Sequence, residues 1–220
     1  MAAILITGAA RGIGLALTRQ LAARGDRVIA LCRIASEELA QIEGIRIIAD
    51  IDVTDEAAVQ RLGAQLDRQP LDTVIHNAGV LTAETLQDLD LDRIRRQFEI
   101  NAIAPLRISQ ALLSNLRNGS KIALITSRMG SIDDNSSGGM YGYRMSKAAL
   151  NSAGKSLSID LRPAGIAVGI FHPGLVATAM TGHQGISPDE AAANLIERID
   201  QLSLDNSGRF YHASGEALPW

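Results

Sequence analysis

The chain of 220 residues has a formal net charge of −3 and contains 46% hydrophobic, 20% charged and 3% aromatic residues, which suits one α/β domain with a core of Ala, Ile, Leu and Val. It has no block of Lys and Arg typical of nucleic-acid binding, and its single cysteine, Cys32, excludes an internal disulfide and a zinc cluster. No apolar stretch approaches the roughly 18–20 residues that span a bilayer, and Met1–Ile6 is too short and uncharged for a signal peptide, so we expect a cytoplasmic protein without a metal.

Short β-branched runs alternate along the chain with longer helical patterns. The short runs predict strands over residues 3–7, 27–31, 46–49, 73–76, 121–126, 166–171 and 209–212. The longer patterns predict helices over residues 12–24, 55–68, 92–116, 141–161 and 188–202. Pro105 predicts a kink in the third of these helices. The alternation indicates a single α/β domain over residues 1–220, with a doubly wound parallel sheet of about seven strands. In such sheets ligands bind beyond the carboxyl ends of the strands.

A glycine-rich segment, Thr7-Gly8-Ala9-Ala10-Arg11-Gly12-Ile13-Gly14, joins the first predicted strand to the first helix. Small residues let the backbone approach a pyrophosphate, and a helix N-terminus supplies N–H groups. The spacing differs from the Gly-x-Gly-x-x-Gly fingerprint, and a tight turn without a ligand is the alternative. The candidate cofactor-binding residues here are Gly8, Ala10, Arg11, Gly12, Ile13 and Gly14.

The end of the second predicted strand bears on the choice between NAD and NADP. An acidic residue there binds the ribose 2′-hydroxyl of NAD, whereas an arginine suits the 2′-phosphate of NADP. Asp26 has the right distance from the glycine loop but precedes the strand, while Arg33 follows it and Arg11 is available from the loop. Two guanidiniums can grip a phosphate, which favours NADP(H). Glu37 keeps NAD(H) open, and both arginines could instead be solvated surface residues.

Polar and small side chains follow the later predicted strands. Asp52-Val53 could accept a hydrogen bond from an adenine amino group, although Asp52 also competes with Thr54 to cap the next helix. The small residues of Asn77-Ala78-Gly79 would leave room for a cofactor. Asn101 lies within a predicted helix, where asparagine is unfavourable, so it is either functional or a residue that bends the helix. The other candidates at strand ends are Ser127, Pro173, Gly174 and Thr178.

Tyr143 and Lys147 lie four residues apart in the helix predicted over residues 141–161. This spacing places both side chains on one helix face, with Cβ atoms roughly 5–6 Å apart. Because a nearby cation favours the charged form of an acid, we expect Lys147 to lower the pKa of Tyr143 from its usual value of about 10. A phenol tuned in this way can act as a general acid or base. By itself, a Tyr and a Lys four residues apart do not indicate catalysis, because the pattern is common on surface helices.

Together these motifs resemble the short-chain dehydrogenase/reductase family, in the family's order and over most of the chain. The resemblance rests on the glycine loop, Asn77-Ala78-Gly79, Asn101, Ser127, the Tyr143/Lys147 pair and Pro173-Gly174. It implies a Rossmann-type fold with helices on both faces of the sheet. It also implies hydride transfer between NADP(H) and a carbonyl or secondary alcohol substrate.

The resemblance implies a role for each residue that matches. Tyr143 would be the general acid/base at the substrate oxygen, and Ser127 would hydrogen-bond that oxygen. Lys147 would lower the pKa of Tyr143 and bind the nicotinamide ribose, while Asn101 would anchor a water that leads protons to Lys147. Thr178 and the backbone near Val176 would clamp the carboxamide of the nicotinamide.

Three departures from the family pattern stand out. His76 occupies the position of a second asparagine. The stretch after Ser127 is longer than in most of the family, and the extra residues predict a flexible polar loop over residues 131–139. This makes Ser131 a competitor for the serine role, but we favour Ser127 because it directly ends a strand. The segment 179–187, where the family usually has a substrate lid, is short.

Residues 127–132 and 138–151, with the tail over residues 207–220, look most like the sniffer-type carbonyl reductase and bacterial C-factor branch. This branch leaves two functions open: an NADP-dependent carbonyl reductase, or a cofactor-binding signalling protein with little turnover. The complete proton-transfer set favours the enzyme.

By resemblance to the family, we expect a homodimer or homotetramer formed through the helices at 92–116 and 141–161. The small side chains that would permit close helix packing are Ala148, Ala149, Ser152, Ala153 and Ser156, although packing within the chain's own core is the alternative. The other expected partner is the small-molecule substrate, with no nucleic acid and no membrane span.

Overall fold

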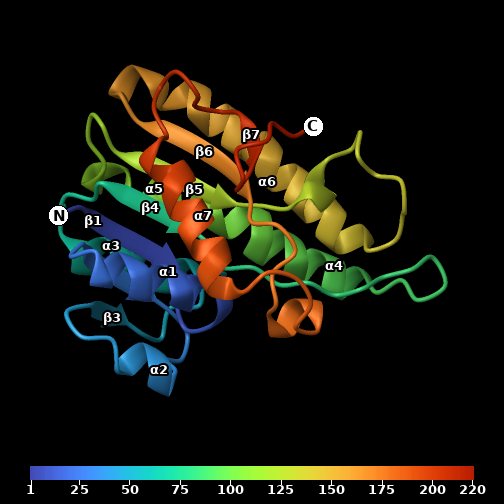
Figure 1. Ribbon diagram of the computed structural model, residues 1–220, viewed down its shortest axis with the longest axis horizontal. Coiled ribbons are helices and arrows are strands. Elements are labelled where there is room, and N and C mark those ends of the chain that lie inside the picture. The colour runs from blue at the N-terminus through green and yellow to red at the C-terminus, as the bar shows by residue number, and fades with distance from the viewer.

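The computed structural model describes residues 1–220, and its centre is a parallel sheet (Figure 1). The strands are β1 (Ala3–Thr7), β2 (Arg27–Leu31), β3 (Arg46–Ile48), β4 (Thr73–His76), β5 (Lys121–Ile125), β6 (Ala167–His172) and β7 (Phe210–His212). Their order is β3-β2-β1-β4-β5-β6-β7, and every neighbouring pair is parallel. The order reverses between β1 and β4, which confirms the predicted doubly wound sheet.

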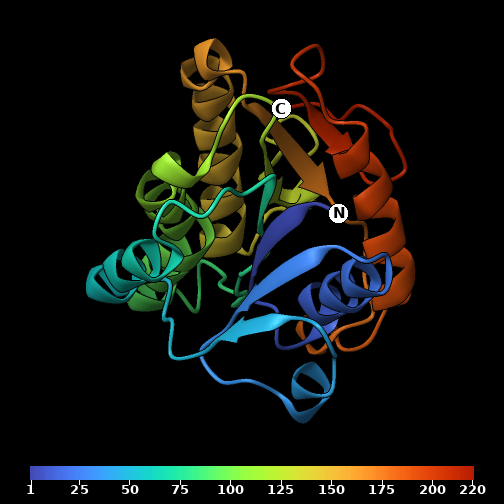
Figure 2. The same cartoon turned by 90° about the vertical axis from the view of Figure 1, so that its left-hand side faces the viewer.

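Helices cover both faces of this sheet, as Figure 2 shows. They are α1 (Gly12–Ala23), α2 (Glu37–Ala40), α3 (Glu56–Leu66), α4 (Leu91–Phe98), α5 (Ala104–Ala111), α6 (Tyr141–Asp160) and α7 (Pro188–Asp200). The sequence pattern did not predict α2, a single turn capped by the Ser36 side chain. Four residues are too few to show a helical periodicity.

Alternation along β1 divides the core between the two faces. Ile4 and Ile6 belong to the cluster that also contains the buried residues of α1 and α7. Ala3 and Leu5 belong to the cluster built with α3 and α5. Because both faces of each inner strand are covered by helices, the middle of each strand is apolar rather than alternating with polar residues. Polar residues such as Arg27, His76 and Lys121 stand only at the strand ends. Arg19 of α1 also pairs with Asp189 of α7, although the two are 170 positions apart in sequence.

The long helix predicted over residues 92–116 is not continuous. α4 ends at Phe98, residues Glu99–Ile103 form a wide π-helical turn, and α5 begins at Ala104. In place of the kink expected at Pro105, the structure has this π turn centred on Asn101. Pro105 cannot donate to the carbonyl four residues earlier, and π turns commonly mark functional positions within helices.

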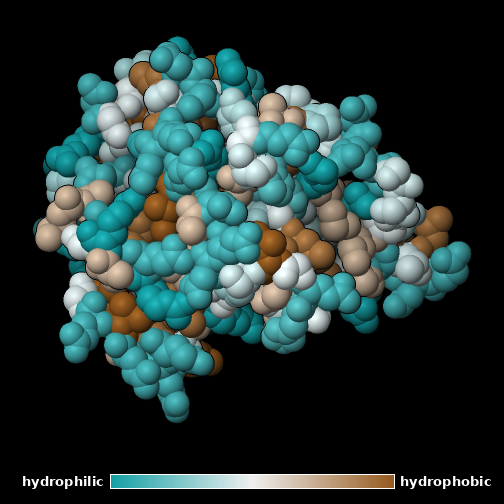
Figure 3. Space-filling view, in the orientation of Figure 1, coloured by the Kyte–Doolittle hydropathy of each residue, from teal (hydrophilic) through white to brown (hydrophobic).

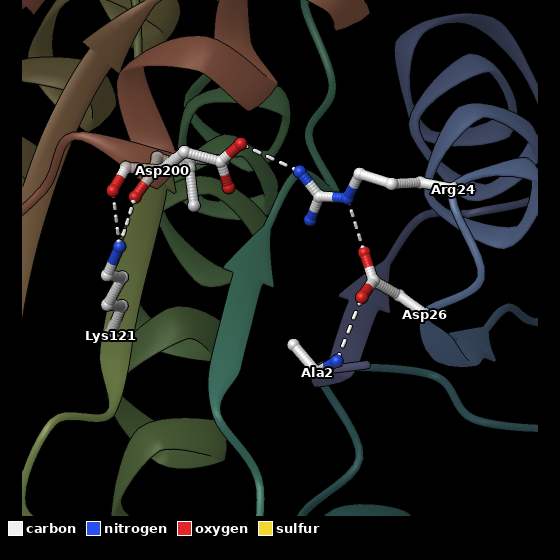
Figure 4. A network of polar contacts seen from close by, with 6 residues as sticks. Ala2, Arg24, Asp26, Lys121 and Asp200 are labelled. Carbon is white, nitrogen blue, oxygen red and sulfur yellow. Dashed lines mark hydrogen bonds and ion pairs between the residues drawn. The ribbon is translucent and has the colours of Figure 1, made fainter.

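The amino-terminal edge of the sheet is held by a polar network (Figure 4). Asp26 accepts hydrogen bonds from the Ala2 amide at 2.8 Å and from Arg24 at 2.6 Å. Arg24 also pairs with Asp200, and Lys121 donates to the carbonyl of Asp200 at the end of α7. Asp26 thus lies at the edge opposite the glycine loop and is not a cofactor ligand, as its place before β2 suggested.

The surface is mostly polar on the face drawn in Figure 3, where hydrophobic residues form small, separate patches. None of the helices combines the length and the hydropathy that crossing a bilayer would require. On α6, Ser152 and Ser156 are exposed, so this part of the small-residue face is not covered by the chain's own core. Assembly through it stays a prediction.

Candidate active site

The glycine loop packs directly against the end of β4. A Cβ at Gly8, which has φ +67°, would lie 2.8 Å from the Ala78 Cα, and a Cβ at Gly14 would overlap the Gly8 carbonyl oxygen. Asn77 donates from its amide group to the carbonyls of Thr7 and Gly8 at 3.1 and 3.2 Å. Only glycine allows this approach, so Asn77-Ala78-Gly79 and the loop form one unit.

The N-terminus of α1 faces this unit without a cap of its own. Arg11 occupies the N-cap position, and no side chain accepts a hydrogen bond from the first turn. Unsatisfied N–H groups at a helix N-terminus bind phosphates well. Thr178 lies on the other side, since a Cβ at Gly12 would be 3.2 Å from the Thr178 methyl carbon. Residues far apart in sequence therefore enclose the loop.

Arg11 lies within the glycine loop, and Arg33 follows β2. Both side chains are exposed, and neither forms an ion pair within the protein. Ser36 donates to the Ala10 carbonyl at 2.7 Å, which ties the segment after β2 to the loop. Glu37, the residue that keeps NAD open, is exposed in the first turn of α2. Both arginine side chains are thus free to bind an anion.

Asp52 forms a local turn rather than a helix cap. Its carboxylate accepts from the Thr54 amide at 2.9 Å and from the Thr54 hydroxyl at 2.7 Å, and these donors, with Arg33 and Arg96, hold its pKa below the usual value. Asp55, not Asp52 or Thr54, caps α3. The Val53 carbonyl accepts from Arg107. An adenine-binding role for Asp52 and Val53 stays a prediction.

Asn101 and Lys147 meet beside Gly79. A Cβ at Gly79 would be 3.3 Å from the Asn101 amide oxygen and 3.6 Å from the Lys147 nitrogen. Asn101 exchanges hydrogen bonds with the main chain of Val80 and donates to the Ser146 hydroxyl at 3.0 Å. Both N–H donors of its side-chain amide are therefore engaged, which leaves the amide oxygen and the main-chain groups for the expected water anchor. Ser146 was not predicted as a site residue. The only indication in the sequence was its position between Tyr143 and Lys147.

Tyr143 and Lys147 lie on one face of α6, with the Lys147 nitrogen 5.8 Å from the centre of the Tyr143 ring. Lys147 is buried, and burial lowers its pKa to about 8. Burial raises the pKa of Tyr143, and hydrogen bonding with Ser127 opposes this effect. The expected lowering of the Tyr143 pKa is therefore wrong for this structure, because removal of the phenol from water raises the pKa instead.

The two candidate serines have different surroundings. Ser127 follows β5 and accepts a hydrogen bond from the Met129 amide at 3.1 Å. Its side chain also hydrogen-bonds with the Tyr143 phenol, which acts to lower the pKa of that phenol. Ser131 donates to the main-chain oxygen of Trp220 at 2.9 Å and accepts from the Asp134 amide at 3.1 Å. The Ser131 hydroxyl is thus engaged in fastening the loop to the C-terminal segment.

Replacing each serine by alanine separates the two assignments. In the role that the family resemblance implies, Ser127 donates to the substrate oxygen, so we expect Ser127→Ala to lower kcat by about 10²–10³-fold. Ser131→Ala should change kcat only a few-fold, because its hydroxyl serves the loop. Steady-state kinetics of both variants tests this, and a larger loss in Ser131→Ala would reverse the assignment.

His172, at the end of β6, is a further residue near the candidate site that the sequence patterns did not indicate. His172 precedes Pro173 and packs edge-on against His212, with ring centres 5.1 Å apart. Burial, His212 and the cations of Arg128 and Lys147 lower its pKa to about 3. Its position at a strand end was the available signal. The turn at Gly174 (φ +90°) also lies against His212.

His76, which stands in place of an asparagine, points into the protein rather than towards the cofactor residues. It is buried, its Nε2 lies 3.0 Å from the Ser109 hydroxyl, and its Nδ1 has no partner. Burial lowers its pKa to about 3. The departure from the family pattern is thus a core packing difference.

His76→Asn should make the protein more resistant to acid. Below pH 6.5 the unfolded chain binds a proton at His76, whereas the folded chain does so only near pH 3. The free energy of unfolding therefore falls as pH decreases between these values, by about 1.4 kcal/mol per pH unit for one proton. Urea unfolding between pH 4 and 7 should show this slope reduced in His76→Asn. The exposed His183→Asn is the control, and an equal slope in His76→Asn and the wild type would contradict the expectation.

Comparisons with known proteins agree with this geometry. A family model described as short chain dehydrogenase matches residues 2–188. A 1-hydroxy-2-glutathionyl-2-methyl-3-butene dehydrogenase from Rhodococcus sp. (strain AD45) is 44% identical over 227 residues, covering 100% of both chains. The C-signal protein of Myxococcus xanthus is 44% identical over 155 residues, covering 69% of this chain and 93% of that protein.

Solved structures give the same result. The carbonyl reductase Sniffer of D. melanogaster superposes with a TM-score of 0.92 at 28% identity, covering 100% of both chains. The NADPH-bound carbonyl reductase from chicken fatty liver superposes with a TM-score of 0.90 at 30% identity, covering 100% of this chain and 99% of that one. The predicted resemblance, including the sniffer-type and C-factor branch, is confirmed.

Proposed function

Because the chain belongs to the short-chain dehydrogenase family, we propose that it transfers hydride between NADP(H) and the carbonyl or alcohol group of a small substrate. The observation that carries the proposal is the meeting of Tyr143, Lys147 and Asn101 at the carboxyl edge of the sheet, beside the glycine loop. A protein that only binds a cofactor needs the loop but not this set.

Each residue has a distinct task in carbonyl reduction. NADPH, when bound, would supply the hydride that adds to the carbonyl carbon. Tyr143 gives its proton to the carbonyl oxygen as charge develops there, and Ser127 donates a hydrogen bond to the same oxygen. Lys147 helps to return a proton to the Tyr143 phenolate after the transfer, and it would bind the nicotinamide ribose. In alcohol oxidation the proton returns to Tyr143.

The residues around the glycine loop fit a dinucleotide phosphate. The uncapped N-terminus of α1 suits the pyrophosphate. Arg11 in the glycine loop and Arg33 after β2 offer two exposed guanidiniums for a 2′-phosphate, and the NADPH-bound chicken liver enzyme supports this choice. Thr178 and the Val176 backbone would contact the carboxamide.

The cofactor preference is tested by titrating the protein with NADPH and NADH and following nicotinamide fluorescence. We expect NADPH to bind more tightly, and Arg33→Ala to weaken NADPH by about tenfold to hundredfold while leaving NADH unchanged, since it removes one charged hydrogen-bonding group. Arg61→Ala, on the exposed side of α3, is the control. Tighter binding of NADH would direct attention to Glu37.

Turnover decides between the enzyme and its alternative. The relation to C-signal leaves open a cofactor-binding signalling protein with little turnover. A panel of aldehydes, quinones and ketones with NADPH should show reduction. In the reverse direction, alcohols that carry a glutathione thioether are worth including, because the Rhodococcus relative is named for one. Tight NADPH binding with no turnover on the panel would favour the signalling role.

A further inference from the structure

A buried carboxylate lies next to the catalytic helix in a segment that the mechanism above does not use. Glu84 lies between β4 and α4, and it is fully buried. Its carboxylate accepts from the Thr82 hydroxyl, from the Gln97 amide at 3.1 and 3.3 Å, and from the Gly142 main-chain N–H at 3.2 Å. A buried carboxylate is costly unless it is hydrogen-bonded, and these donors meet that need.

The start of α6 lacks the usual means of capping. Met140 occupies the N-cap position in a left-handed conformation, with φ 48° and ψ 45°, and has no side-chain acceptor. The first turn contains no acidic residue. Helices normally satisfy the main-chain N–H groups of their first turn with the side chain of a Ser, Thr, Asp or Asn at the N-cap. Here the Glu84 carboxylate accepts from Gly142, and the Glu84 carbonyl accepts from Met140 at 2.8 Å.

The same contact fixes α6 against α4. A Cβ at Gly142 would lie 3.1 Å from the Ile94 Cα and would overlap the Gln97 amide, so the first turn of α6 is pressed onto α4. Gln97 in turn is held by Glu84 and donates no other side-chain hydrogen bond. The first turn therefore has one defined position, and Tyr143 is the next residue after Gly142.

We propose that Glu84 is a positioning residue: it caps the catalytic helix from a separate segment and thereby sets the place of the Tyr143 phenol. The proposal rests on the function proposed for Tyr143. It links the chain that leaves Asn77-Ala78-Gly79, on the cofactor side, to the helix that carries the proton donor. Small displacements of reacting groups have large effects on rate, about 10²-fold for 1 Å.

The decisive comparison is between Glu84→Gln and Asp88→Asn. The first keeps the shape but places an amide N–H₂ where the Gln97 amide and the Gly142 N–H can only donate. The second alters an exposed carboxylate in the same segment that has no side-chain partner. Hydrogen exchange of residues 140–144 should be at least about tenfold faster in Glu84→Gln and unchanged in Asp88→Asn. Thr82→Val, which removes one donor to Glu84, should show a smaller change in the same direction and serves if Glu84→Gln does not fold.

Kinetics then separate positioning from general loss of structure. With the carbonyl substrate found in the panel, kcat of Glu84→Gln should fall by about tenfold to hundredfold. The KM, the Kd for NADPH and the number of cofactors bound per chain should stay within twofold. Unchanged exchange at 140–144, or a kcat that falls only in proportion to the bound cofactor, would overturn the proposal. If the wild type itself had no turnover, the proposed function would fail, and the exchange result alone would decide whether Glu84 caps α6.

Discussion

Replacing Tyr143 by phenylalanine is expected to lower kcat by about 10²–10⁴-fold, the range for losing a positioned general acid. The ring is buried and would keep its packing and its place 5.8 Å from the Lys147 nitrogen. Only the hydroxyl is lost, so the Kd for NADPH and the thermal stability should change little. Because burial raises the pKa of Tyr143, the phenol holds its proton at neutral pH, and carbonyl reduction by the wild type should not decline through neutrality.

Tyr141→Phe is the matched control, because that ring lies two residues earlier on the same helix and is partly exposed. It should retain kcat within a few-fold. Stopped-flow single turnovers with NADPH measure the chemical step directly. A Tyr143→Phe variant that still turns over at a similar rate would remove the general acid from Tyr143 and with it the proposed mechanism.

Lys147→Met is expected to lower activity by about 10²–10³-fold without destabilising the protein at pH 7. Burial holds the pKa of Lys147 at about 8, against 10.5 for the free group. Below pH 8 both folded and unfolded chains carry the charge, and the folded state bears its whole burial penalty, about 3 kcal/mol. Methionine removes that penalty but leaves the Ile125 carbonyl, which Lys147 contacts at 2.9 Å, without a donor.

The lost hydrogen bond costs about 1–3 kcal/mol, so the unfolding free energy at pH 7 should stay level or rise by as much as about 2 kcal/mol. Between pH 8 and 10.5 the unfolded chain binds more protons than the folded one, so the wild type gains stability with pH. The advantage of Lys147→Met should therefore disappear by pH 10. Urea unfolding at pH 7 and 10 measures both values, and a clear loss of stability at pH 7 would contradict the expected balance.

The strands were predictable because the inner strands share an apolar middle, with polar residues only at their ends. β1, β2 and β4 have the predicted bounds, since a run such as Arg27–Leu31 is too short for a helix and too apolar for a loop. The glycine loop and the Tyr143/Lys147 spacing were likewise readable, because backbone approach and helix periodicity both restrict local sequence.

Other features depend on neighbours that are distant in sequence. The π turn around Asn101 packs against Gly79 and Ser146, and Pro105 predicted an irregular helix there without giving its place or its form. The direction of the Tyr143 pKa depends on how far the phenol is removed from water, which spacing alone does not give. The cap of α6 comes from Glu84, almost sixty residues before it, so a search for a capping residue beside Met140 finds none.

The packing of α1 against α7 has a consequence for synthesis of the chain. Ala16, Leu17 and Leu21 of α1 are buried in one cluster with Ala192 and Leu195 of α7. At about 5–20 residues per second, a ribosome needs roughly 10–35 s to reach α7 after α1 has emerged. During that time the nascent chain carries an uncovered apolar face beside β1. We therefore expect chaperones to bind the growing chain until its final helix, α7, covers this apolar face.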